Sequence, residues 1–187
     1  MVVQGMMNDQ ELAALSAAVA RPDADDLALV DGALRAHPDD PRLHFLYASL
    51  CAAHGRSVQA HGSFMRALEI APDFAVARFQ TGLFELTSGE ASEALATWGP
   101  LLRLPEENYF RQFVEGLTHM IRDEFGPAIA RFRRGIALNI ENPPLNDDMN
   151  MLIEQCETLA GGGSPDMADE GSSPTSFVLN QFSRTRH

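Results

Sequence analysis

Apolar residues recur with a helical period along most of the chain, and the pattern itself repeats every 34 residues. Between residues 41 and 142, small residues occupy two columns and large aromatic residues occupy a third. The columns are Ala48, Gly82 and Gly116; Ala60, Ala94 and Ala128; and Phe64, Trp98 and Phe132. A fixed period of this length is typical of stacked pairs of helices. The sequence therefore predicts an all-α fold, a right-handed α-solenoid of helix-turn-helix repeats.

Each repeat predicts two helices that are separated by a turn and closed by a helix breaker. The three repeats are residues 41–74, 75–108 and 109–142. Their first helices are expected at residues 42–54, 75–88 and 109–122, and their second helices at residues 57–71, 91–104 and 125–139. Gly55 and Gly89 end two of the first helices, and Asp123 takes that place in the third repeat. Gly99 and Pro100 predict a kinked or shortened second helix in repeat two.

The regions outside the three repeats carry weaker patterns. Residues 8–40 predict a degenerate N-terminal repeat or cap, with helices at 8–19 and 23–36, after a disordered segment at residues 1–7. A capping helix is expected within residues 143–160, from Asn146 to Leu159. The Gly- and Ser-rich composition of residues 161–174 predicts a flexible linker, and an apolar-containing tail follows at residues 175–187.

The columns, the turn glycines and the run Ala-Leu-Glu-Ile-Ala-Pro at residues 67–72 resemble the tetratricopeptide repeat (TPR) family. The resemblance covers residues 41–142 well and residues 8–40 weakly. It implies that the first helix of each pair lines an inner groove in which a protein ligand lies. Chaperone-binding members hold a C-terminal carboxylate there with Lys, Asn and Arg. This sequence instead has Phe45, Ser49, Gln80, Phe110 and Val114 at those positions, so that activity is not implied.

The first helices carry a further apolar stripe, which we assign to the face opposite the second helices because of its spacing of three, four and three. The predicted partner-binding groove consists of Phe45, Phe79, Leu83, Leu86, Phe110, Phe113, Leu117 and Met120. Such side chains cost about 1.5–3 kcal/mol each in water, and patches of this kind mark interaction sites.

Three coverings of this stripe are open. A partner can supply an apolar helix or an extended apolar segment. The tail of the chain can dock there, in cis or in a dimer, through Phe177, Val178, Leu179 and Phe182. Alternatively, neighbouring first helices can bury the stripe against one another.

The composition restricts the partners and the location. The formal net charge of −12 over 187 residues argues against nucleic acid and against an anionic membrane surface as partners. No apolar run is long enough to span a membrane, and the first ten residues lack the pattern of a signal peptide. The two cysteines, Cys51 and Cys156, are expected to be buried in a reducing compartment. A cytoplasmic location is therefore expected.

No sequence motif for catalysis, cofactor binding or metal binding is present, and the six histidines have no ligand spacing. We therefore expect no enzyme activity, no cofactor and no metal site. Arg131, Arg133 and Arg134 form a basic ridge on the last second helix, which is either a solvated face or a contact for an acidic partner.

The function favoured by the sequence is a non-enzymatic protein-interaction module or adaptor that binds an apolar helix or an extended peptide. Two alternatives keep the same fold. The size, acidity and apolar groove are also similar to those of the bacterial class II-type secretion chaperones, which shield hydrophobic segments of their clients. The chain can also be an accessory or assembly subunit of a larger enzyme complex.

Overall fold

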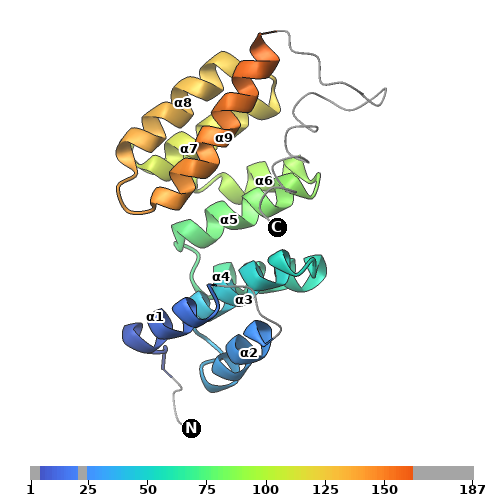
Figure 1. Cartoon of the computed structure of the whole chain (residues 1–187), viewed down its shortest axis with the longest axis vertical. Helices are drawn as coiled ribbons and strands as arrows, with labels where there is room; N and C mark the ends of the chain where they lie inside the picture. Colours follow the sequence, from blue (N-terminus) through green and yellow to red (C-terminus); the bar gives the residue numbers. More distant parts are fainter. Residues whose placement is uncertain (1–4, 21–24, 162–187) are drawn as a thin grey trace. The chain divides into compact units, whose positions relative to one another are not determined.

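The computed structural model describes residues 5–20 and 25–161 of the chain. Within these ranges the chain forms nine α-helices and one 3₁₀-helix, η1, and contains no β-strand (Figure 1). The all-α fold class predicted from the sequence is confirmed. The chain divides into two compact units, one ending at Thr81 and the other beginning at Gly82.

The helix boundaries follow the 34-residue repeat closely. The helices are α1 (Asp9–Ala18), α2 (Asp26–Ala36), α3 (Pro41–Ala53), α4 (Ser57–Ile70), α5 (Ala75–Thr87), α6 (Ala91–Trp98), η1 (Leu101–Arg103), α7 (Tyr109–Ile121), α8 (Phe125–Leu138) and α9 (Pro143–Ala160). Most predicted ends agree to within one residue. The break between α6 and η1 confirms the shortened helix predicted at Gly99 and Pro100, because proline cannot donate the backbone hydrogen bond that a continuous helix requires.

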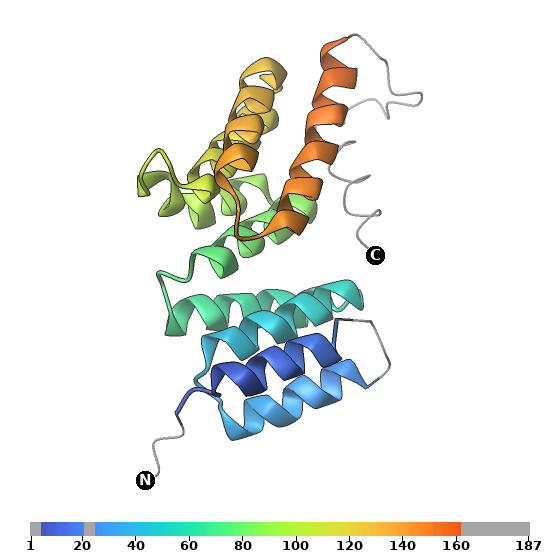
Figure 2. The same ribbon diagram turned by 60° about the vertical axis from the view of Figure 1, so that its left-hand side comes forward.

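The core of the first unit lies between α1, α2 and α3, which are neighbours in Figure 2. Its fully buried members are Val19, Val30 and Leu50. Partly buried side chains surround them: Leu15, Leu27, Leu34, Leu46 and Tyr47. The helix α4 packs along α3 on the other side. A second cluster, which consists of Ala67, Leu68 and Ala77 with Phe45 and Phe74 packed against it, joins α3 and α4 to the first turns of α5.

In the second unit, aromatic rings fill the places where glycine has no side chain. A Cβ atom on Gly82 would lie 2.2 Å from the Trp98 ring, and one on Gly116 would lie 2.5 Å from the Phe132 ring. The columns of small and aromatic residues in the sequence are therefore direct contacts between α5 and α6 and between α7 and α8. The helices α7, α8 and α9 lie side by side (Figure 1).

The turn between the helices of each pair has the same backbone conformation in all three repeats. Gly55, Gly89 and Asp123 have φ angles of 70°, 87° and 58°. The amide after each of these residues donates to the carbonyl five positions earlier, as in a Schellman motif. These bonds are Arg56 to Cys51 (2.8 Å), Glu90 to Glu85 (2.9 Å) and Glu124 to His119 (3.0 Å). Aspartate is among the few non-glycine residues that adopt this conformation, so the third repeat keeps the turn without glycine.

The predicted capping helix is present but begins earlier than expected. We predicted Asn146–Leu159, and α9 runs from Pro143 to Ala160. Proline suits the first helical positions, where the backbone N–H has no intrahelical partner. The buried side chain of Asn139 holds this connection by donating to Asn146 Oδ1 (2.8 Å) and accepting from the Asn142 N–H (3.0 Å).

The N-terminal segment also differs in part from its prediction. Residues 1–7 were expected to be disordered, but Gly5 and Met7 lie in the described chain and hydrogen-bond to residues near the start of α3. The linker at 161–174 and the tail at 175–187 lie outside the described residues, except for Gly161. The division into three repeats stays a prediction.

Gly135 on α8 provides a test of the packing between α7 and α8. A Cβ atom there would lie 2.3 Å from the Phe113 ring. We predict that Gly135→Ala lowers the free energy of unfolding, because overpacking costs about 1–3 kcal/mol. The higher helix propensity of alanine offsets roughly 1 kcal/mol of this loss. Urea unfolding followed by circular dichroism measures this change.

Gly126→Ala is the matched control, because it makes the same change on the same helix where the new Cβ meets nothing within 4 Å. It should leave the stability unchanged or raise it by up to about 1 kcal/mol. Adding Phe113→Leu to Gly135→Ala should recover part of the loss, since the two side chains are in contact. Equal effects of the two glycine substitutions would contradict the packing described here.

Candidate interaction surface

The predicted partner-binding groove does not present an open apolar surface. Seven of its eight side chains are buried, with exposed fractions between 0% and 7%: Phe79, Leu83, Leu86, Phe110, Phe113, Leu117 and Met120. Phe45 is partly buried. The expectation of an exposed stripe is therefore corrected. That these residues bind a partner stays a prediction.

The geometry of two stripe residues explains the burial. The Phe113 ring occupies the space over Gly135 of α8, so it faces the second helix of its own pair. The Phe45 ring lies 6.1 Å from the Phe64 ring of α4 and 5.7 Å from the Phe74 ring. Both rings thus lie on the face toward the second helix, whereas the sequence placed them on the opposite face. A large ring at this position can turn toward its partner helix when the partner residue there is glycine or alanine.

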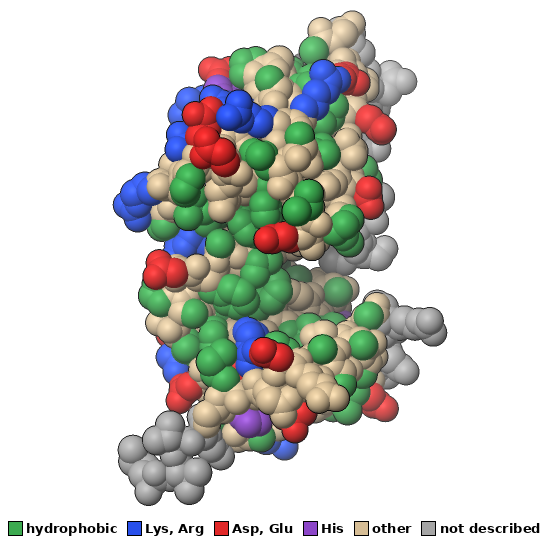
Figure 3. Space-filling model, turned by 90° about the vertical axis from the view of Figure 1, so that its left-hand side faces the viewer, with side chains coloured by type: hydrophobic (Ala, Val, Ile, Leu, Met, Phe, Trp, Pro, Cys, Tyr) green, Lys and Arg blue, Asp and Glu red, His purple; other side chains and the backbone are tan. Residues whose placement is uncertain are grey.

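The arginine ridge on α8 is neutralised by carboxylates of the same chain. In the upper part of the face drawn in Figure 3, blue and red side chains lie next to one another. The ion pairs are Arg131 with Glu115 (2.9 Å), Arg133 with Glu157 (2.7 Å) and Arg134 with Glu106 (3.4 Å). Arg111 also binds Glu115, at 2.8 Å. Of the two interpretations of the ridge, this pairing favours a solvated face with little net charge.

Two side chains of reactive types, His119 and Cys156, have surroundings that restrict them. His119 Nδ1 lies 2.5 Å from the Glu124 carboxylate, across the turn between α7 and α8. Burial raises the pKa of the Cys156 thiol to about 11, so the reactive thiolate is disfavoured at neutral pH. The described residues contain no group of three or more His, Cys, Asp or Glu that could bind a metal ion. None of the described helices is both long and apolar enough to span a membrane.

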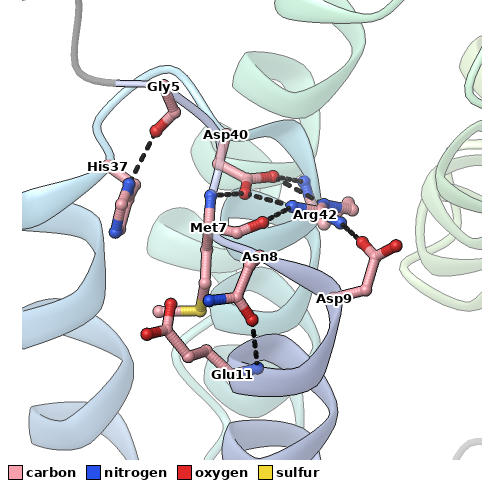
Figure 4. A network of polar contacts seen from close by, with 8 residues as sticks. All are labelled: Gly5, Met7, Asn8, Asp9, Glu11, His37, Asp40 and Arg42. Carbon is pink, nitrogen blue, oxygen red and sulfur yellow. Dashed lines mark hydrogen bonds and ion pairs between the residues drawn. The ribbon is translucent and has the colours of Figure 1, made fainter.

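The principal polar network joins the N-terminal segment to the start of α3, and the sequence did not reveal it (Figure 4). The buried carboxylate of Asp40 accepts hydrogen bonds from the Met7 N–H (3.0 Å) and from Arg42 Nε and Nη2 (3.0 and 2.8 Å). The Arg42 guanidinium also donates to the Met7 carbonyl and to Asp9 Oδ1 (2.6 Å). His37 Nδ1 lies 2.6 Å from the Gly5 carbonyl oxygen.

These contacts set the ionisation of Asp40. Burial raises the pKa of this carboxyl, but the hydrogen bonds from Arg42 and Met7 and the positive charge of Arg42 outweigh that effect. The pKa of Asp40 is therefore lower than its ordinary value. From the sequence alone, Asp40 could be placed only at the beginning of a helix. Its partner Met7, and the partner Asp9 of the neighbouring Arg42, each lie 33 residues earlier, a distance that no local pattern spans.

The solved structures with a similar fold include two of the protein MamA. They are MamA from Desulfovibrio magneticus RS-1, from residue 41 to its end, and the ArsTM double mutant of MamA RS-1. Each match has a TM-score of 0.57 and 14% sequence identity, and covers 96% of this chain and 98% of the other. MamA is a TPR-like helical solenoid protein, and the likeness places this chain in the same fold class. No family model matches this sequence, and no curated protein does.

The ionised Asp40 makes the stability of the first unit depend on pH. Because the pKa of Asp40 is lowered in the folded chain, its contribution is present above the unfolded pKa of about 3.9 and is lost as the pH falls through the folded pKa. We predict that Asp40→Asn lowers the free energy of unfolding by about 1.5–3 kcal/mol at pH 7, since charged hydrogen bonds are lost. The difference from wild type should shrink below pH 4.

Urea unfolding monitored by circular dichroism between pH 3 and pH 7 tests this dependence. Asp39→Asn is the matched control, because this neighbouring carboxylate is largely exposed and pairs only at the surface with Arg66. It should change the stability by less than about 1 kcal/mol at any pH. A constant difference between wild type and Asp40→Asn across the pH range would show that the charge of Asp40 does not stabilise the fold.

Proposed function

We propose that this chain is a non-enzymatic protein-interaction module that binds an apolar helix or an extended apolar segment of a partner protein. The likeness to TPR-like solenoids supports the architecture, which is built from helix pairs with extended faces. The pairing of the arginine ridge with carboxylates of the same chain argues for apolar rather than electrostatic recognition on α7 and α8.

One observation carries the proposal: the terminal helices α1 and α9 each pack on neighbouring helices through apolar side chains. The helix α9 lies on α8 and buries Leu145, Met149 and Leu152 along one stripe. The helix α1 directs Leu15 into the core between α2 and α3, and Val19 follows at its end. Both helices dock through apolar residues spaced three or four positions apart, which is the pattern of a helix-in-groove ligand.

The eight residues of the predicted groove contribute to the proposed function through the structure that they form. Seven of them are buried and contribute to the apolar interior of the first helices. The tail residues Phe177, Val178, Leu179 and Phe182 match the chemistry of an apolar ligand segment, and we include their docking in cis or in a dimer in the proposal. Two alternatives to this function are a class II-type secretion chaperone, which shields hydrophobic client segments, and an accessory or assembly subunit of a larger enzyme complex.

The proposal is tested by capturing partners on the immobilised full-length chain and mapping the bound segment with overlapping synthetic peptides. We predict a segment with apolar residues at helical spacing or in an extended run. Replacing one central apolar residue of that peptide by Asp should weaken binding about ten- to a hundredfold, since each buried side chain contributes about 1.5–3 kcal/mol.

Isothermal titration calorimetry with each peptide measures this loss and should show a negative heat-capacity change, which accompanies apolar burial. The control peptide carries the same Asp substitution on its polar face and should bind like the original. Binding that survives the apolar substitution but disappears at high salt would point to electrostatic recognition and would refute the proposal.

A further inference from the structure

The two helices at the ends of the described chain both cover an apolar face of their neighbours, but they bury very different numbers of their own side chains. The helix α9 has 18 residues and buries five side chains: Leu145, Met149, Leu152, Ile153 and Cys156. The helix α1 has 10 residues, and none of them is fully buried; only Val19, which ends it, is. Helices shorter than about 12–15 residues are marginal on their own in water. The helix α1 therefore depends on the face that it covers.

That face is apolar and is built by two longer helices. Val30 of α2 and Leu50 of α3 form its centre, and both are buried with Val19. Around them lie partly buried side chains of α2 and α3: Leu27, Leu34, Leu46 and Tyr47. Leu15 and Val19, one helical turn apart, enter this face from α1. Without α1, the face would be an open apolar surface between two packed helices, which is the shape that an amphipathic helix binds.

Polar contacts fix the orientation of α1 rather than adding to its burial. Arg42 pairs with Asp9 in the first turn of α1, and Asp9 is almost fully exposed. Arg42 and Asp40 also hold the Met7 backbone just before the helix (Figure 4). Asn8 caps the helix by accepting a hydrogen bond from the Glu11 N–H at 2.8 Å. The face thus selects a helix whose N-terminal turn is acidic and approaches Arg42.

We infer that the face of α2 and α3 under α1 is a docking site for a partner's amphipathic helix, and that α1 occupies this site until the partner displaces it. The partner helix has apolar residues at the spacing of Leu15 and Val19 and an acidic residue in its first turn, facing Arg42. This inference rests on the proposed function and gives that function a site. It also gives α1 an autoinhibitory role that α9, with its five buried side chains, does not share.

The test uses the full-length chain and a fluorescent synthetic peptide of residues 6–20 as the probe. In the wild-type chain the tethered α1 competes with the peptide at high effective concentration, so binding should be weak. Leu15→Asp removes the apolar anchor of α1 and should tighten peptide binding at least about tenfold, measured by fluorescence anisotropy. Ala14→Asp places the same charge on the exposed side of α1 and should bind the peptide like wild type.

Two further measurements keep the outcome decisive. If circular dichroism shows that Leu15→Asp unfolds the chain, Asp9→Arg replaces it, because this change repels Arg42 without altering the apolar cluster. It should also tighten peptide binding several-fold. A peptide that carries Asp in place of Leu15 and Val19 should not bind any variant. Equal peptide binding by the Ala14→Asp variant and by the folded variant with a weakened α1 overturns the inference.

The remaining outcomes separate this inference from the proposed function. If wild-type chain is a dimer by light scattering and Leu15→Asp makes it monomeric, a second copy occupies the face, and the partner-helix version is wrong. If captured partners bind wild type and Leu15→Asp equally while the peptide binds neither, the chain is an interaction module whose site lies elsewhere. Peptide binding without any captured partner would support the site and count against the proposed function.

Discussion

The close contact between a residue without a bulky side chain and an aromatic ring determines how the helices of each pair fit together. Trp98 lies where a side chain on Gly82 would be, and Phe132 lies where one on Gly116 would be. Each glycine costs about 1 kcal/mol of helix propensity relative to alanine. Burying a large aromatic side chain contributes about 1.5–3 kcal/mol. The favourable term is larger, so the repeat keeps glycine inside helices, where it would otherwise be unfavourable.

The parts of the fold that depend on local chemistry could be predicted from the sequence. The turns at Gly55 and Gly89 need a left-handed residue, and Pro100 must interrupt the helix because it falls in the interior of the predicted segment. The position of the Phe113 ring could not be predicted in this way. It depends on Gly135, 22 residues away, which leaves space on α8 for a ring that the helical period assigned to the opposite face. Contacts between a small residue and an aromatic ring therefore explain two results. Those visible as columns in the sequence led to the correct prediction of paired helices, and the one between Gly135 and Phe113, which was overlooked, led to the wrong prediction of an open stripe.

Several charged side chains in the described regions join different elements of the same chain. The Asp40 carboxylate connects the N-terminal segment to α3, and Arg133 connects α8 to Glu157 of α9. A simple count of charges gives −12 and suggests a strongly acidic surface. The pairing changes that picture on α8, where each arginine of the ridge lies beside a carboxylate. Recognition on such a surface depends more on shape and apolar contact than on long-range attraction.

A stack of repeats leaves an uncovered apolar face at each terminus, and terminal helices with a polar outer side solve this problem. In this chain the two terminal helices, α1 and α9, are held by different kinds of contact. The helix α9 is held by apolar burial, which neither salt nor pH weakens strongly. The helix α1 is held by two apolar side chains, Leu15 and Val19, together with an ion pair from Arg42 to Asp9 in its first turn. Elements with little apolar burial open at low free energy, whereas well-buried elements open only near global unfolding. The helix α1, which has no fully buried residue of its own, is thus the element that we infer to exchange with a partner's helix.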